Sequence, residues 1–524
     1  MPDFKRRDFL KAGAVGVAAA GANLTVPPAR AQHYLEHSWS NYDWGSGPAV
    51  PDRLYQGPFT NYGADANAPG GEVVMATSPS HDIVPNYGMG LTVYISGDIG
   101  PPRLPGQTLE RSIEDLIKLP FVQKVYLRPN WREVQKRPGR LDFPDWWTIT
   151  FALARQYGKR VGFRIMLENP DFPEPGMPQF LMEKVPYVPL KGSWPGDPSQ
   201  VRYRKTHAMP RYDDPAYQAA FAELNALLAE QYDGSPDVEY MDTMMYGFWG
   251  EGHSWPFDGN PFPNAAIAQQ TMLRMLDTQL RSWTKTPIVT NTQPDFSNVG
   301  NAAVLDRTVR SNNWIRSDTI FIENTQIEAL SNRPPWIAAI SEVPMTTGAP
   351  DQLAIEDGVT MNEQVVAHVL AVGANYFSIW NWHNISAAHV LSYYDKYPQV
   401  IDRAARRIGY RVYPAFIWPF ERDGSGGIVV GLANDGVAAP PGVVRLTLSD
   451  ADGRVIASGG LDAGYPRPTG IRQAMLSWAG KRDWAGLRLS AELEVKGVRH
   501  PLRWACAQNL APDGSLVLRR NIRG

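Results

Sequence analysis

The residues best suited to chemistry are two glutamates that each follow a run of β-forming residues. Glu251 ends the motif Gly-Phe-Trp-Gly-Glu at residues 247–251, and Glu342 follows the apolar run at residues 336–340. Glycosidic cleavage needs one acid that protonates the leaving oxygen and a second that stabilises or attacks the anomeric carbon. The sequence therefore predicts Glu251 and Glu342 as a catalytic pair that acts on carbohydrate. Glu168, after an earlier strand, is an alternative partner for Glu251.

Other polar and aromatic residues also follow the predicted strands. Aromatic rings stack on sugar faces, amides bind hydroxyl groups, and a guanidinium keeps a nearby carboxylate ionised. Trp380 and Trp382 are two residues apart and share one face of a strand, so we expect one to pack in the core and the other to stack on ligand. The predicted substrate-binding residues are Arg128, Asn130, Trp131, Glu168, Trp249, His253, Asn291, Trp314, Trp380, Trp382 and His383.

These residues lie on a regular alternation of strand-like and helix-like segments over residues 91–409. Eight β-α units predict a parallel (β/α)8 barrel, or TIM barrel, which carries its chemistry on the loops after the strands. No Gly-rich phosphate loop follows the first strand, which argues against a doubly wound open sheet. The strands are expected to begin near Leu91, Val122, Val161, Val238, Pro287, Thr308, Trp336 and Asn375.

The sequence allows two positions for the sixth strand. The β-like run at residues 319–322 is close to the strand that begins near Trp336, which leaves little room for a parallel crossover with its helix. We therefore place the strand at residues 308–314 and expect a helix at residues 323–330. After residue 410, short alternating runs separated by Asn-Asp-Gly and Asp-Gly turns predict an antiparallel β-sandwich at residues 410–524. Residues 32–90 are expected to be an irregular leader.

The first 31 residues have the features of a twin-arginine (Tat) export signal. Arg6 and Arg7 precede an uncharged stretch at residues 12–26, and Ala29-Arg30-Ala31 forms a cleavage site. The uncharged stretch is too short and too weakly apolar for a stable membrane span. The Tat export machinery is thus a predicted partner, and the expected location is the periplasm or the exterior.

Composition excludes several other classes of function. The chain has 51 basic and 53 acidic residues, so it has no excess of positive charge with which to bind the phosphates of a nucleic acid. The one cysteine, Cys506, excludes internal disulfides and Cys-based zinc sites. His253 and His383 could form a metal site with Asp258 or His81. However, no His pair at i, i+4 and no H-E-x-x-H motif supports such a site. No metal and no cofactor is predicted.

The pattern of these residues resembles clan A of the glycoside hydrolases, a group of retaining (β/α)8 enzymes. The resemblance rests on acids after strands four and seven, Arg128 after strand two and Trp380 after strand eight. It implies Glu251 as acid/base and Glu342 as nucleophile. The sequence departs from the clan at Gly250, where the clan has an Asn that binds the sugar 2-hydroxyl.

A closer resemblance rests on the motif at residues 247–253 together with the C-terminal β-domain. It is to a bacterial family of glycosidase-like barrels whose C-terminal domain has no known function. The proline-rich loop at residues 168–212 is expected to wall one side of the pocket. The prediction is an exported glycoside hydrolase, retaining and exo-acting on a plant or microbial glycan. The alternative is a non-catalytic carbohydrate-binding barrel of the periplasm.

Overall fold

The computed structural model of the protein describes most of the chain after residue 73. The described residues are 74–95, 101, 105–170, 172, 174–191, 208–254, 257, 259–292, 302–317, 329–345, 361–381, 387–396, 398–422 and 424–520. The predicted export signal and most of the predicted leader lie outside this part of the chain.

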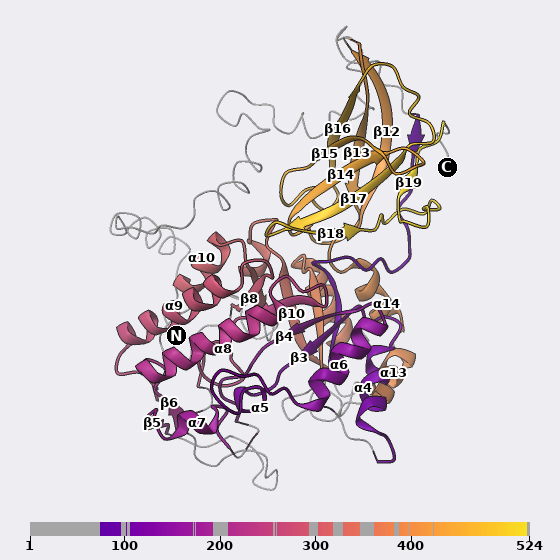
Figure 1. Ribbon diagram of the computed structural model, residues 1–524. Coiled ribbons are helices and arrows are strands. Elements are labelled where there is room, and N and C mark those ends of the chain that lie inside the picture. Colours follow the sequence, from indigo (N-terminus) through magenta and orange to yellow (C-terminus); the bar gives the residue numbers. More distant parts are fainter. Residues whose placement is uncertain are drawn as a thin grey trace, which may run out of the picture.

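Eight parallel strands close into a barrel, as the alternating sequence pattern predicts (Figure 1). Their order around the barrel is their order in the chain, and the last strand pairs with the first. The strands are β2 (Gly90–Tyr94), β3 (Lys124–Leu127), β4 (Arg160–Phe163), β7 (Val238–Asp242), β8 (Ile288–Asn291), β9 (Trp314–Ser317), β10 (Ala339–Met345) and β11 (Tyr376–Asn381). The fold is a (β/α)8 barrel.

Helices pack around the outside of the barrel (Figure 1). Thr108, Asp214 and Asn264 each accept a hydrogen bond from the first turn of the helix that they precede. Each such cap contributes about 1 kcal/mol. The helices are α4 (Leu109–Ile117), α5 (Trp131–Val134), α6 (Asp145–Gln156), α7 (Gln179–Met182), α8 (Pro215–Tyr232), α9 (Ala265–Ser282), α10 (Ala302–Arg310), α12 (Met361–Ala371), α13 (Ala387–Lys396) and α14 (Pro398–Arg407). Between β4 and α8, β5 (Tyr187–Pro189) pairs with β6 (Ala208–Pro210) in a small antiparallel ribbon.

Side chains along the barrel strands alternate between the helix layer and the barrel interior. Val125 and Phe163 pack outward in the large apolar cluster formed with the helices. Tyr240 of β7 contacts Tyr376 of β11 with ring centroids 5.4 Å apart, although these strands are not neighbours. Such contacts are possible only across the inside of the barrel. The interior aromatic residues are Tyr94, Tyr126, Tyr240, Trp314 and Tyr376.

The sixth barrel strand differs from the prediction. Residues 308–314 were expected as a strand, but α10 continues to Arg310, and β9 begins only at Trp314. Ala302–Arg310 keeps a helical apolar face through Val304 and Thr308, which are buried. The prediction was wrong because short runs rich in β-branched residues are compatible with either structure. Most of the helix expected at residues 323–330 lies outside the described residues.

The C-terminal part of the chain is a β-sandwich, as predicted. One sheet has the order β1-β12-β13-β16, and the second has the order β15-β14-β17-β18, with β19 paired to β17. Along β17, alternate residues are buried between the sheets. The strands are β1 (Met75–Ala76), β12 (Val412–Arg422), β13 (Ser425–Asn434), β14 (Val443–Ser449), β15 (Val455–Gly460), β16 (Ile471–Ala479), β17 (Arg488–Val495), β18 (Val498–Leu502) and β19 (Leu516–Val517).

The residues just before the barrel belong to this sandwich. The range 32–90 was expected as an irregular leader, but Met75 of β1 pairs with Ile417 of β12, and Pro79 forms a bridge with Cys506. In Figure 1 the indigo arrow of β1 lies among the orange and yellow strands. The sandwich is therefore built from both flanks of the barrel.

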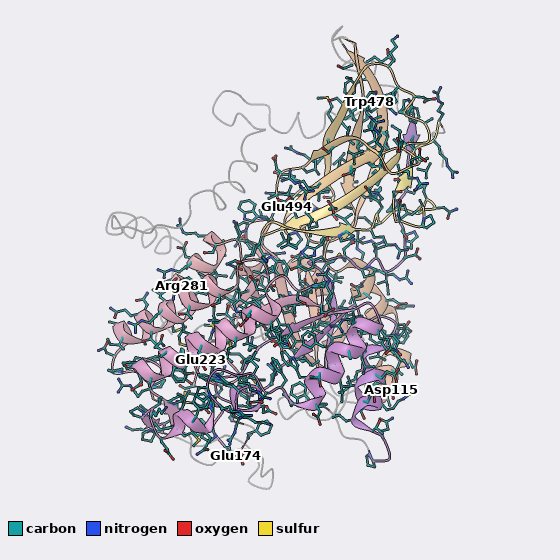
Figure 2. The ribbon with its side chains drawn as sticks, viewed as in Figure 1. Asp115, Glu174, Glu223, Arg281, Trp478 and Glu494 are labelled. Carbon is teal, nitrogen blue, oxygen red and sulfur yellow. The ribbon has the colours of Figure 1, made fainter. Side chains whose placement is uncertain are left out.

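The sandwich packs against the end of the barrel where the strands begin. Lys496 donates hydrogen bonds to the Trp283 carbonyl and to the Asn313 side chain, each at 2.9 Å. Both acceptors lie just before barrel strands. Figure 2 shows Glu494 at the barrel end of the sandwich and Trp478 toward its far end. The sandwich thus leaves the carboxyl ends of the strands, where TIM barrels carry their sites, uncovered.

Candidate active site

A tight loop after β7 carries Glu251. The Phe248 N–H donates to the His253 carbonyl at 2.9 Å, and the Gly252 N–H donates to the Tyr246 carbonyl at 2.9 Å. These bonds fold residues 246–253 back on themselves. As a result, Glu251 reaches the barrel although it is nine residues beyond the end of β7 at Asp242.

The glycines of this loop are required by its geometry. A Cβ atom at Gly247 would lie 2.0 Å from the His253 carbonyl oxygen, and Gly250 has a φ of +77°. Trp249 also adopts a left-handed conformation, with a φ of 51°. A non-glycine residue in this region costs on the order of 1 kcal/mol, and such strain is concentrated at functional sites.

Three basic side chains surround the Glu251 carboxylate. Arg128 Nη1 lies 3.4 Å and Arg164 Nη1 3.3 Å from Oε1, while His253 Nε2 lies 3.2 Å from Oε2. Arg164 also donates to the Trp249 carbonyl at 3.0 Å, which ties the loop to the end of β4. The Glu251 side chain is 11% exposed, whereas Arg128 and Arg164 are nearly fully buried.

Glu342 lies within β10 rather than beyond its end. It pairs in register with Ser378 of β11, and its side chain is 2% exposed. Arg316 of β9 forms an ion pair with Glu342. Arg316 also donates to the Tyr94 hydroxyl at 3.1 Å and to the Tyr126 hydroxyl at 3.2 Å. Since both tyrosines belong to the interior cluster, Glu342 faces the inside of the barrel.

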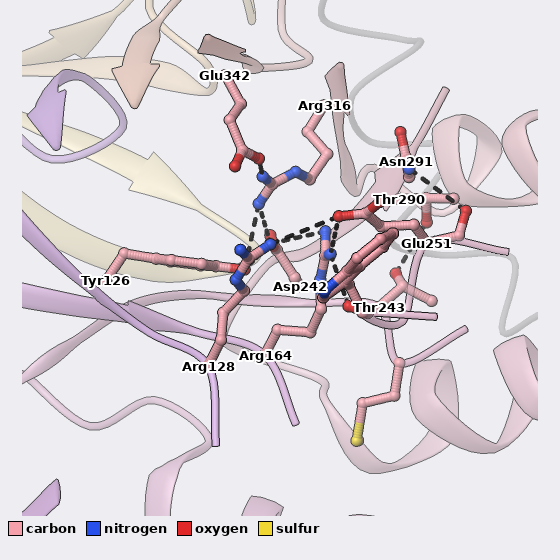
Figure 3. Close-up of polar contacts among 12 residues, drawn as sticks. Tyr126, Arg128, Arg164, Asp242, Thr243, Glu251, Thr290, Asn291, Arg316 and Glu342 are labelled. Atoms are coloured by element: carbon pink, nitrogen blue, oxygen red, sulfur yellow. Dashed lines mark hydrogen bonds and ion pairs between the residues drawn. The ribbon is translucent and has the colours of Figure 1, made fainter. Parts of the chain in front are cut away.

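Asp242 links the two glutamates. Its Oδ2 lies 3.3 Å from Arg164 Nη2 and forms an ion pair with Arg316. Tyr126 donates a hydrogen bond to the same oxygen. Burial raises the pKa of Tyr126 well above its ordinary value, so the hydroxyl keeps the proton that it donates. A continuous path of ion pairs therefore runs Glu251–Arg164–Asp242–Arg316–Glu342 (Figure 3).

The structure brings several predicted ligand residues to this network. Arg128 and His253 contact Glu251 directly, and the Asn291 side chain donates to the Glu251 carbonyl at 3.3 Å. The Trp249 ring lies 5.8 Å from the His253 ring. Arg128 was expected beside a carboxylate of the site, and it forms an ion pair with Glu251, whereas Arg316 contacts Glu342.

Three other predicted ligand residues have structural positions instead. Trp131 is the first residue of α5 and packs edge-on against Tyr217, and the Asn130 amide binds Glu133 at 2.9 Å at the start of that helix. Trp314 begins β9, so it lies in the aromatic core near the end of the barrel against which the sandwich packs. That error follows from the misplaced sixth strand.

Glu168 is completely buried. Burial raises the pKa of Tyr212 well above its ordinary value, and the Glu168 charge adds to the effect. The Glu168 carbonyl accepts a hydrogen bond from Trp249 N at 2.9 Å, so Glu168 supports the loop of Glu251. In β11 the Trp380 backbone pairs with Pro344, but the Trp380 side chain, Trp382 and His383 lie outside the described residues.

Sequence reasoning missed Arg164, Asp242 and Arg316. A signal for Asp242 and Arg316 was present, because an inward aromatic residue is followed two positions later by a charged one in Tyr240-x-Asp242 and Trp314-x-Arg316. Residues two apart in a strand share a face. The aromatic layer therefore fixes a charged layer directly above it, and Tyr126-x-Arg128 has the same spacing.

Within the described residues, no group of three or more His, Cys, Asp or Glu side chains could hold a metal ion. In the same part of the chain, the helices are all too short or too polar to cross a bilayer.

No protein-family model matches the chain, and no curated protein matches it. Among solved structures, endo-glycoceramidase II from Rhodococcus sp. is similar at 13% identity, covering 76% of this chain and 100% of its own, with a TM-score of 0.35. The catalytic domain of beta-amylase from Paenibacillus polymyxa is similar at 10% identity, covering 61% and 99%, with a TM-score of 0.39. GH5_18 from Bifidobacterium longum is similar at 13% identity, covering 56% and 69%, with a TM-score of 0.35.

Proposed function

We propose that the protein is an exported glycoside hydrolase that cleaves a plant or microbial glycan by retention, using Glu251 and Glu342. One observation carries the proposal: two carboxylates borne by separate β-α units meet in one network of ion pairs inside the barrel. Two acids held over one sugar ring are the requirement for glycosidic cleavage. The proline-rich segment at residues 168–212 supports release of end sugars over internal cutting.

Glu342 is assigned the role of nucleophile. The assignment rests on the resemblance to clan A, and the ion pair with Arg316 holds the Glu342 carboxylate in place. In the first step a Glu342 oxygen bonds to the anomeric carbon, the bond to the leaving oxygen breaks, and Glu251 donates its proton to that oxygen. In the second step Glu251 removes a proton from water, the water oxygen bonds to the anomeric carbon, and Glu342 is released.

Glu251 is assigned the role of acid/base because its two oxygens have different neighbours. Oε1 faces Arg128 and Arg164, whereas Oε2 lies 3.2 Å from His253 Nε2. The proton that is transferred therefore belongs to the Oε2 side, where His253 can hold it by a hydrogen bond. Trp249, partly exposed beside His253, is in a position to contact the sugar.

A panel of aryl glycosides and natural oligosaccharides tests the assignment. Removing the nucleophile in Glu342→Gln lowers kcat by about 10³-fold or more on every substrate. Glu251→Gln loses about 10²- to 10⁴-fold on natural glycans. It loses less on aryl glycosides, whose leaving groups need no proton. Glu421→Gln, at an exposed glutamate of the sandwich, serves as the control and keeps full activity. Equal turnover by all four proteins would reject the proposal.

A second function, carbohydrate binding without catalysis, is favoured by one specific observation. Glu342 is 2% exposed, and the ion pairs that hold Asp242, Glu251 and Glu342 would serve a static structure equally well. Under that function, calorimetry detects glycan binding to the wild type while no product forms, and Glu342→Gln leaves the affinity unchanged.

Export is proposed from the twin-arginine motif and the cleavage site at residues 29–31. Replacing both arginines in Arg6→Lys/Arg7→Lys is expected to retain the full-length precursor in the cytoplasm, measured by cell fractionation. Processing and export at the wild-type level in that variant would contradict it.

A further inference from the structure

The buried links between the two candidate catalytic groups carry a further inference. We propose that Asp242 is a positioning residue that couples Glu251 to Glu342, with Arg164 and Arg316 as the two connecting groups. The inference rests on the proposed function for its kinetic consequence. Its geometric basis, the contacts of Asp242 with both arginines, is independent of that function.

Each connecting arginine is shared between Asp242 and one glutamate. Arg164 holds Asp242 through Nη2 and Glu251 through Nη1, each at 3.3 Å. Arg316 holds Asp242 through Nη1 and Glu342 through Nη2. A guanidinium is a rigid plane, so a shift of the anion at one nitrogen moves the other nitrogen as well. The position of either glutamate therefore depends on Asp242, although neither touches it in this path.

Burial makes the coupling strong. The side chains of Asp242 and Arg316 are 0% exposed, and that of Arg164 is 1% exposed. Water does not compensate for a lost partner at such depth, and a buried charge left without its partner is costly. The network contains three carboxylates, Asp242, Glu251 and Glu342, and three guanidiniums, of Arg128, Arg164 and Arg316. Removing one negative charge at its centre forces both arginines to redistribute toward their glutamates.

The structure provides a matched control three residues away on the same strand. Glu239 is also fully buried and paired, but with Lys124 at 2.8 Å and with the Tyr376 hydroxyl at 2.7 Å. Glu239→Gln and Asp242→Asn each replace one buried carboxylate of β7 with an amide of the same size. Only the second variant alters the path between Glu251 and Glu342.

The experiment compares the wild type with these two variants by kinetics and by NMR of protein labelled at the glutamate carboxyl carbons. The Glu251 and Glu342 resonances are assigned from their loss in Glu251→Gln and Glu342→Gln. In Asp242→Asn both resonances move, and kcat falls by about 10²-fold while KM stays within about 3-fold. In Glu239→Gln neither resonance moves, and kcat stays within about 3-fold of the wild type.

Movement of only one resonance, or of neither, in Asp242→Asn overturns the inference. If that variant does not fold, Glu342→Gln supplies the test, because release of Arg316 must then move the Glu251 resonance, and a resonance that stays in place overturns the inference. Absence of turnover in the wild type would reject the proposed function alone, since the NMR comparison does not depend on activity.

Discussion

The two ends of the barrel each hold a buried acid with basic partners, and they differ in what covers them. At the end where the strands begin, Glu239 pairs with Lys124, and Tyr87 donates to the Glu239 carbonyl at 2.8 Å from the segment that joins the sandwich. At the other end, Glu251 keeps 11% exposure despite two arginines. The closed end is therefore stabilising, and the partly open end is the place where a substrate can meet a carboxylate.

Glu239 occupies an irregular position in its strand. The register between β4 and β7 shifts between Val161 and Gly162, so Glu239 is the extra residue of a β-bulge. A bulge re-aims a side chain. Burial opposes the ionisation of Glu239, but the charges of Lys124 and Arg160 outweigh it, and its pKa is lowered. The segment between β1 and β2 supplies a further contact, from Gly88 N to the Glu239 carboxylate at 2.9 Å.

Breaking the closed end is expected to give the largest effect on stability. Glu239→Ala leaves Lys124 buried without its partner, so the free energy of unfolding falls by about 3–5 kcal/mol, measured by urea denaturation. The folded fraction keeps its kcat. Asp306→Ala, which removes an exposed ion pair with Arg310, changes stability by no more than about 0.5 kcal/mol. A similar small change in Glu239→Ala would contradict the structural role.

The closed end also predicts a pH dependence of stability. His500 stacks on Tyr87 with ring centroids 3.5 Å apart, and burial, aided by the Arg160 charge, lowers its pKa from 6.5 to about 4. The unfolded chain therefore binds a proton between these values and the folded one does not. The contribution of His500 to the free energy of unfolding is fully present above pH 6.5. It is lost as the pH falls toward 4, which lowers the free energy of unfolding by up to about 3 kcal/mol.

Urea denaturation at several pH values measures this contribution as the difference between the wild type and His500→Phe, a variant that preserves the stacking on Tyr87. The variant is expected to lose less stability than the wild type on acidification. Parallel curves for the two proteins would show that His500 is not responsible.

Much of the barrel was predictable because strand-like segments alternate regularly with helix-like segments over residues 91–409. Seven strands follow from this alternation, and the sandwich follows from short alternating runs separated by turn residues. The sixth strand was misplaced because Thr308 and Val309 suit a helix end as well as a strand, and that error carried Trp314 to the wrong end of the barrel. Local sequence could not distinguish these cases, since the choice depends on packing against neighbouring units.

The candidate site was predictable in part. Glu251 and Glu342 were singled out because TIM barrels carry their chemistry at the carboxyl ends of the strands, although Glu342 lies within β10 rather than after it. Arg164 and Arg316 were not found, because they meet Glu251 and Glu342 only when neighbouring strands that are separated in the sequence pair side by side in the barrel. Trp131 was misassigned because a strand end and the first turn of a following helix are adjacent in sequence.

At the open end, the smallest expected effect comes from Gly250→Ala. A Cβ atom there lies 3.0 Å from Arg164 Cδ, and the left-handed backbone with φ +77° disfavours alanine by about 1 kcal/mol. We expect kcat to fall by about 10-fold because Arg164 shifts away from Glu251. Gly453→Ala, with φ +82° and open space around it, carries the same backbone strain and should leave kcat unchanged. Equal kinetics in both variants would contradict the role of Arg164.

Trapping the covalent intermediate tests the central claim most directly. An aryl glycoside that carries fluorine at C2 slows the second step of a retaining glycosidase, so the sugar accumulates on the nucleophile. Peptide mapping by mass spectrometry of the wild type is expected to locate one sugar on the peptide that contains Glu342, with none on that peptide in Glu342→Gln. A sugar attached to any other residue, or no adduct with a glycoside that the enzyme turns over, would contradict the assignment of Glu342 as nucleophile.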